Sequence, residues 1–143
     1  MMKFFPWIFV PTFLFAVGCD RQPDSQTYHV EVPSHAVWTA SGIVPQAGQT
    51  LTLNASDRYV DHAQGHDCDP EGIAAAQPCT GKWPEPGVTG LALMARIGPE
   101  GKPFLVGKHA TRHIARGGEL YLGVNDDIVT ENSNALPVKI ELR

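Results

Sequence analysis

Apolar and polar residues alternate in short runs along most of the chain, which is the pattern of β-strands that bury one face. Gly, Pro, Asn and Asp cluster between these runs and favour tight turns. The pattern predicts an all-β protein, a single antiparallel β-sandwich of the galactose-binding-like or jelly-roll type over residues 28–143. The expected strands are residues 28–32, 37–40, 50–54, 90–97, 104–107, 119–125 and 136–142.

Two details of these strands can be predicted as well. Pro137 lies early in the last strand, and because proline cannot donate to a ladder it predicts an edge position. Alternation along residues 90–97 divides the side chains between two faces of one strand, with Leu91, Leu93 and Ala95 on the first and Ala92, Met94 and Arg96 on the second.

The first 18 residues, MMKFFPWIFVPTFLFAVG, are apolar apart from Lys3. A charged start followed by an apolar run is typical of a secretory signal peptide. The run is short for a bilayer and contains Pro6 and Pro11, which argues against a membrane-spanning anchor. It ends in Ala-Val-Gly before Cys19, which resembles the bacterial lipobox. We therefore expect residues 1–18 to be removed and Cys19 to carry lipid.

Residues 19–27 are polar after the cysteine and are expected to form a tether. Asp20 resembles the inner-membrane retention signal of enteric-type bacteria. These features predict a lipoprotein of the bacterial cell envelope, held at a membrane by its lipid and facing the periplasm or the cell surface.

Composition narrows the possible functions. The chain has 143 residues, enough for one ordinary domain, with 43% apolar and 18% charged residues. Its formal charge is −4, which excludes the Lys- and Arg-rich surface that nucleic-acid binding needs. The sequence contains no phosphate-binding glycine motif and no recognisable Ser-His-Asp context, so we expect a binding protein and not an enzyme.

The three cysteines fit an oxidising compartment. If Cys19 carries lipid, Cys68 and Cys79 remain as a pair, and we expect them to form a disulfide. The alternatives are two free thiols, or a metal pair with His62 or His66.

Two loops carry candidate chemistry. Residues 125–134 are rich in Asn and Asp, and calcium takes carboxylate, amide and main-chain oxygens from loops of this kind. The alternative is a solvated turn. Residues 59–90 form a long polar stretch that contains Trp83. This side chain is either an exposed platform for a sugar or a partner, or it folds over the core.

The order of the segments is informative. A Leu-Thr-Leu strand at 51–53 follows the turn at Gly48, and Asp-Pro-Glu-Gly comes at 69–72. The strand that ends in Ala-Arg-Ile-Gly leads into Pro-Phe-Leu-Val-Gly at 103–107, and Leu-Tyr-Leu-Gly-Val-Asn ends before Asp126. In this order the chain resembles the PA-IL-like galactophilic lectins of bacteria over residues 43–142. That family consists of small β-sandwiches that bind galactosides through calcium, so the resemblance implies this fold, ligand and cofactor.

The resemblance also implies site residues in the last loop. Asp126 matches a family Asp that binds both metal and sugar. An adjacent Asn pair in the family falls on Glu131 and Asn132 when the last strand is aligned. It falls on Ser133 and Asn134 when residues are counted from Asp126 without a gap.

Further residues are implied outside that pair. Thr130 and the main-chain carbonyl of Tyr59 complete the expected metal ligands. Glu71 takes the place of a family Gln that contacts sugar, whereas Cys68 falls where the family has a His. Trp83 would complete the sugar site, together with Asp126 and the Asn at 132.

The sequence therefore predicts a membrane-anchored, non-catalytic, lectin-like lipoprotein that binds a galactoside-like carbohydrate with the help of calcium. The alternative is an envelope lipoprotein that keeps the sandwich and binds a protein instead, as an inhibitor, an immunity factor or an accessory subunit.

Overall fold

The computed structural model describes residues 24–63, 65–72 and 83–143, and these contain strands and one 3₁₀ turn but no α-helix. No helix among them is long and apolar enough to span a bilayer. The strands are β1 (Gln26–Pro33), β2 (Thr39–Ala40), β3 (Thr50–Ala55), β4 (Tyr59–Asp61), β5 (His66–Cys68), β6 (Leu93–Ile97), β7 (Phe104–Leu105), β8 (His109–His113), β9 (Leu120–Val124), β10 (Asn132–Ser133) and β11 (Ala135–Leu142), and the turn η1 is Val129–Glu131.

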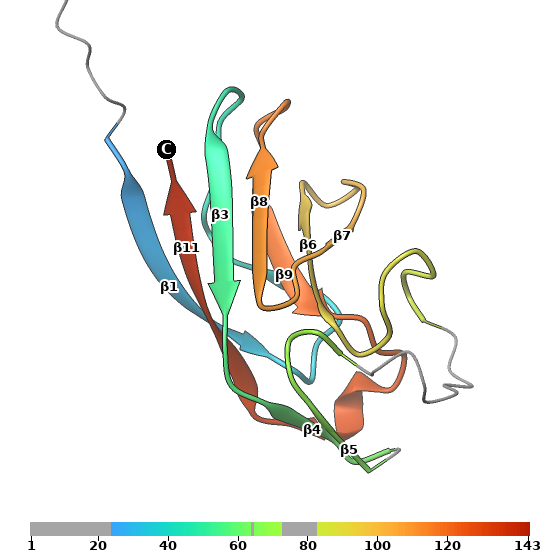
Figure 1. Ribbon diagram of the computed structural model, residues 1–143. Helices are drawn as coiled ribbons and strands as arrows, with labels where there is room; N and C mark the ends of the chain where they lie inside the picture. Colours follow the sequence, from blue (N-terminus) through green and yellow to red (C-terminus); the bar gives the residue numbers. More distant parts are fainter. Residues whose placement is uncertain (1–23, 64, 73–82) are drawn as a thin grey trace, which may run out of the picture.

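The strands form two four-stranded sheets in the orders β1-β11-β3-β8 and β2-β9-β6-β7. All described strand pairs are antiparallel. A third, smaller sheet, β10-β4-β5, lies at one end of the molecule, the lower end in Figure 1. The predicted all-β sandwich is confirmed.

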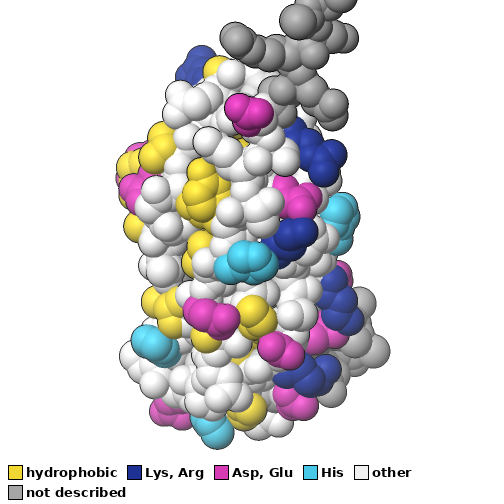
Figure 2. Space-filling model, turned by 90° about the vertical axis from the view of Figure 1, so that its left-hand side faces the viewer, with side chains coloured by type: hydrophobic (Ala, Val, Ile, Leu, Met, Phe, Trp, Pro, Cys, Tyr) yellow, Lys and Arg dark blue, Asp and Glu magenta, His cyan; other side chains and the backbone are white. Residues whose placement is uncertain are grey.

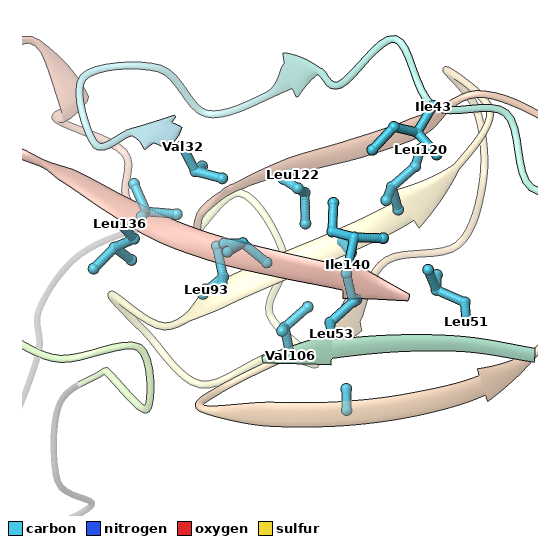
Figure 3. Packing of buried hydrophobic residues seen from close by; sticks show 14 of the residues in the cluster. Val32, Ile43, Leu51, Leu53, Leu93, Val106, Leu120, Leu122, Leu136 and Ile140 are labelled. Atoms are coloured by element: carbon cyan, nitrogen blue, oxygen red, sulfur yellow. The ribbon is translucent and has the colours of Figure 1, made fainter. Parts of the chain in front are cut away.

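The core lies between the two large sheets and follows the alternation in the sequence. Leu51 and Leu53 of β3 are 0% and 1% exposed, and their polar neighbours face outward. Figure 3 shows side chains of both sheets, among them Leu122 of β9 and Ile140 of β11, pointing into the same apolar layer. Each buried Leu or Ile contributes about 1.5–3 kcal/mol from the area it removes from water.

Charged side chains of both signs are mixed on the outer surface. Figure 2 shows this for the side of the molecule that lies on the left of Figure 1. On β11, Lys139 forms an ion pair of 2.6 Å with Glu141. Such exposed pairs contribute little to stability, so the core and the ladders hold the sandwich together.

Two strand boundaries need correction. The strand predicted from Gly90 begins only at Leu93, because Leu91 has a left-handed φ of 58° that interrupts the extended backbone. The first strand begins at Gln26, two residues before the predicted domain start. Within β6, Leu93 and Ala95 belong to the core cluster, and the other face is covered as well, since Met94 is as fully buried as Leu93.

Pro137 was expected on an edge strand, and this prediction is wrong for β11, which lies between β1 and β3. The ladder with β3 begins only at Val138, one residue after the proline. On that side, Pro137 uses its carbonyl, which accepts a hydrogen bond from the Ser56 amide at 3.2 Å. The missing N–H of the proline therefore falls outside the β3 ladder.

Candidate functional site

A cluster of buried polar side chains lies where the small sheet meets the end of the sandwich. Asp61, Asp126 and Asn132 are 0%, 1% and 8% exposed. Burial of carboxylates is costly unless hydrogen bonds or a cation compensate for the lost water. Polar side chains buried this deeply therefore form a candidate ligand site.

The backbone brings these residues together from distant parts of the chain. Asp126 follows the end of β9, and Asn132 opens β10, where it pairs directly with Asp61 of β4. Alternation along β4 places Asp61 on the same buried face as Tyr59. The short sheet β10-β4-β5 thus holds the cluster at one end of the sandwich.

Hydrogen bonds fix the Asp126 carboxylate from two sides. One oxygen accepts from the Ile128 amide at 3.0 Å, and the other accepts from the Asn132 side-chain amide at 2.8 Å. The same Asn132 nitrogen donates to the Ser34 carbonyl at 3.0 Å. The Oδ1 atom of Asn132 is buried and has no hydrogen-bond partner in the described structure. The cluster therefore holds a buried acceptor oxygen whose hydrogen-bonding capacity is unused.

Tyr59 and Cys68 form the floor of this cluster. The Tyr59 hydroxyl donates to the Leu91 carbonyl at 2.7 Å. Burial raises its pKa far above the ordinary value, and its ionisable neighbours Cys68 and Asp126 raise it further. Burial also raises the pKa of the Cys68 thiol to about 11. Both groups are therefore neutral at physiological pH.

Asn125, the neighbour of Asp126, holds the adjoining loop in place. It is fully buried, and its side-chain amide donates to the carbonyls of Glu85 and Val88, both at 2.9 Å, and of Thr89 at 3.3 Å. Its Oδ1 accepts from the Glu85 amide at 3.0 Å. One side chain therefore anchors the loop at residues 85–89 to the end of β9.

The predicted metal ligands divide into two groups. Asp126, Asn132 and Tyr59 lie together in the buried cluster. Thr130 and Glu131 lie on η1 with exposed side chains. Asn134 is also exposed, at a left-handed φ of 74°, and its carbonyl accepts from the Ser34 hydroxyl at 2.7 Å. Of the two alignments of the Asn pair, the one that includes Asn132 places a ligand-type side chain beside Asp126.

Glu71 belongs to a separate arrangement. Its carboxylate accepts from the Lys108 amide at 2.6 Å and closes over Gly107, where a Cβ would lie 2.6 Å from it. Asp69 forms a 2.7 Å ion pair with the Lys108 ammonium, and the hydrogen bond from this ammonium lowers the Asp69 pKa. Glu71 is thus held against the turn between β7 and β8.

Trp83 is half-buried and packs against the core cluster, with its ring over Gly90. A Cβ at Gly90 would lie 2.5 Å from the ring, so a larger residue there would displace the tryptophan. Of the two interpretations of Trp83, the structure favours the side chain that folds over the core.

The predicted disulfide is not supported. Cys68 is a free cysteine whose side chain is buried, and Cys79 lies outside the described residues, as do the signal-peptide segment 1–18, Cys19 and Asp20. The Cys68 thiol interacts with the Tyr59 hydroxyl. Two site residues were not anticipated from the sequence, Asp61 and Ser34.

The state of Cys68 can be tested by alkylation followed by peptide mass spectrometry. We expect iodoacetamide to modify Cys68 at pH 8 at least about 100-fold more slowly in the native protein than after unfolding, because burial and the high pKa suppress the thiolate. Unfolding without a reductant should be enough to expose it. Labelling of unfolded Cys68 only after reduction would contradict the free thiol.

The described strands form an antiparallel β-sandwich with a buried polar cluster at one end, and comparison with known structures agrees on the fold. A solved lectin domain, the EclA N-terminal domain, described as a PllA-like lectin, aligns with a TM-score of 0.58 and 21% identity, over 82% of this chain and 95% of that domain. No family model matches the sequence. No curated protein matches it either.

Proposed function

We propose that this protein is a non-catalytic carbohydrate-binding protein whose site is centred on Asp126 and Asn132. The observation that carries the proposal is the cluster of buried carboxylates and an amide at the end of the sandwich. The similarity in fold between this chain and a solved lectin domain supports the same function. A galactoside-like sugar is the ligand class that we test first.

Calcium is the cofactor that fits this cluster best. Asp126 is buried without a Lys or Arg ion pair among the described residues, and Asn132 offers an acceptor oxygen without a partner. The described residues include no group of three or more His, Cys, Asp or Glu that could hold a metal. The donor set is instead carboxylate, amide and main-chain oxygens, which calcium accepts and zinc does not prefer.

In this proposal the chain's own residues prepare the site. Asp126 and Asn132 present oxygen ligands, and Asp61 adds a buried carboxyl group from β4. Bound calcium would supply the positive charge and coordinate sugar hydroxyls. Asn125 keeps the loop at residues 85–89 beside the site, where it would limit which sugars enter.

We propose further that the protein is a lipoprotein, anchored through Cys19 to a membrane of the cell envelope, with Asp20 favouring the inner membrane. The segment before β1 supports this through its sequence alone.

A glycan-binding assay tests the proposed function. We expect the full chain to bind galactosides in millimolar calcium and to lose at least 10-fold in affinity in excess chelator, because the sugar hydroxyls would lose their metal. Asp126→Asn should abolish binding, since it removes the charge at the centre of the cluster.

Asp127→Asn is the matched control, because it removes the same charge from an exposed neighbour in the same loop. It should bind as the natural chain does. Retention of sugar binding by Asp126→Asn in chelator would refute the site. If no glycan binds and the chain instead captures an envelope protein stably in chelator, the protein-binding alternative is favoured.

A further inference from the structure

A second pocket lies far from the Asp126 cluster, between β6, β7 and the end of β8. It has a volume of about 230 Å³. Its apolar part is formed by Ile97, Phe104 and Ile114, and its cationic part by Lys102, Arg112 and Arg116, with His113 beside them. An apolar floor with a cationic rim fits a small organic anion better than it fits a neutral ligand.

The cations of this pocket are not neutralised by carboxylates. Lys102, Arg112 and Arg116 form no ion pair with the described residues, whereas Arg58, Lys108, Lys139 and Arg143 each have one. Glu119, the acidic residue closest to Arg116 along the chain, is engaged elsewhere, with the Gly42 amide and the Tyr121 hydroxyl. In a chain of formal charge −4, three cations without an acidic partner at one pocket are a local excess of positive charge.

Arg112 is held in place within the pocket. Its guanidinium carbon lies 4.8 Å from the centre of the Phe104 ring, and it donates to the Thr111 carbonyl at 3.0 Å. An arginine ordered by an aromatic ring loses less entropy when it binds an anion. Several cationic side chains match the three or four oxygens of a phosphate group better than the two oxygens of a carboxylate.

The register of the sheet fixes which end of the sandwich carries this pocket. Gln26 pairs with Leu142, Leu142 with Leu51, and Leu51 with Arg112, so these residues form one row across the sheet. The Asp126 cluster lies at the other end, where β11 begins. The chain therefore enters β1 at the end that carries the cationic pocket. Figure 1 shows that β1 begins at the end of the molecule where β8 ends.

This position sets a distance to the proposed anchor. Gln26 follows Cys19 by seven positions, and seven extended steps of the chain span at most about 25 Å. If Cys19 carries lipid, the cationic pocket stays near the headgroups while the Asp126 site points away from the membrane. This step rests on the anchor in the proposed function, but the pocket itself does not.

We propose that this pocket is a phosphate-binding site, occupied by the phosphate of an anionic lipid headgroup or of a soluble phosphate ester. Arg112 and Arg116 bind the phosphate oxygens, Lys102 adds charge, and the apolar floor receives the carbon part of the ester. An occupied pocket of this kind would orient the lectin-like site outward from the membrane.

NMR on the full chain in phosphatidylcholine nanodiscs tests the proposal, with backbone amide shifts of Phe104, Arg112 and Ile114 as the readout. Two probes are compared, inorganic phosphate and nanodiscs that contain 30% phosphatidylglycerol. We expect the shifts to respond to at least one probe. The double variant Arg112→Gln, Arg116→Gln should bind the probe with about 30-fold lower affinity, as measured by titration of these shifts. Each basic residue near an anionic surface accounts for roughly a fivefold loss of affinity.

Arg58→Gln is the control, because it removes one arginine charge at an exposed site on the other end. It should leave the response unchanged. A response to inorganic phosphate shows that a soluble phosphate group is sufficient as a ligand, and a response to phosphatidylglycerol alone identifies the headgroup. No response to either probe, or equal loss in Arg58→Gln, overturns the proposal. None of these outcomes depends on sugar binding, so this proposal and the proposed function fail separately.

Discussion

Asn125→Ala should destabilise the protein by about 3–4 kcal/mol, although the residue would touch neither a sugar nor a metal. The substitution leaves the Val88 carbonyl and the Glu85 amide without their partner. It also removes one of two hydrogen bonds from the carbonyls of Glu85 and Thr89, which still accept from the amides of Val88 and Ala92. A buried polar group that loses its partner costs about 1–3 kcal/mol, and water can reach some of these groups once the loop loosens. For a domain of this size the midpoint of thermal unfolding should fall by about 10–15 °C.

Urea unfolding and thermal unfolding of the two proteins measure this effect. Asn54→Ala is the matched control, because Asn54 is only half-buried and its side chain makes one hydrogen bond, to His109 at 2.7 Å. It should cost no more than about 1 kcal/mol. If Asn125→Ala were no more destabilising than Asn54→Ala, Asn125 would not be the anchor of the loop at residues 85–89.

The strands with clear alternation could be predicted from the sequence because alternation reports burial directly. β3, β9 and β11 were predicted to within one or two residues. β8 was missed since Ala110 is its one buried residue, and His, Thr and Arg occupy its outward positions. A strand that contributes so little apolar area is specified by its partner β3 and not by its own sequence.

The site was harder to predict than the fold. Asp126 and Asn132 were predicted as site residues because calcium takes its oxygen ligands from loops rich in Asn and Asp. Within that loop, the family resemblance selected these two residues. Asp61 was missed because its role depends on pairing with Asn132, which is 71 residues away in the chain. The one local signal was an acidic residue two positions after Tyr59 in a short alternating run. Pairings over such distances are set by the tertiary fold.

Calcium should raise the thermal stability of the full chain, and this is the second large effect that we expect. The side chains of Asp126 and Asp61 are almost closed to water, so a bound cation there would be poorly screened by solvent. A cation that binds only the folded state stabilises by about 2.7 kcal/mol at 100 times its dissociation constant. The midpoint should rise by about 5–15 °C between chelator and several millimolar calcium.

The concentration range matters, because calcium sites of extracellular modules have dissociation constants near 10⁻⁴–10⁻³ M. Micromolar calcium would therefore leave the site empty. Magnesium at the same concentration should stabilise much less, since it demands a smaller and more regular oxygen cage. A shift of equal size with both ions would indicate general screening of the acidic chain.

Two variants connect the calcium effect to the cluster. Asp126→Asn should remove the shift, because the amide carries no charge, and Asp127→Asn should keep it, because that side chain is exposed to solvent. A shift that survives Asp126→Asn would place the calcium elsewhere. If the natural chain shows no shift at all, Asn132 is sufficient as the partner of Asp126, since its side-chain amide already donates to the carboxylate at 2.8 Å. The buried acidic cluster would then be a structural feature of a sandwich without a metal.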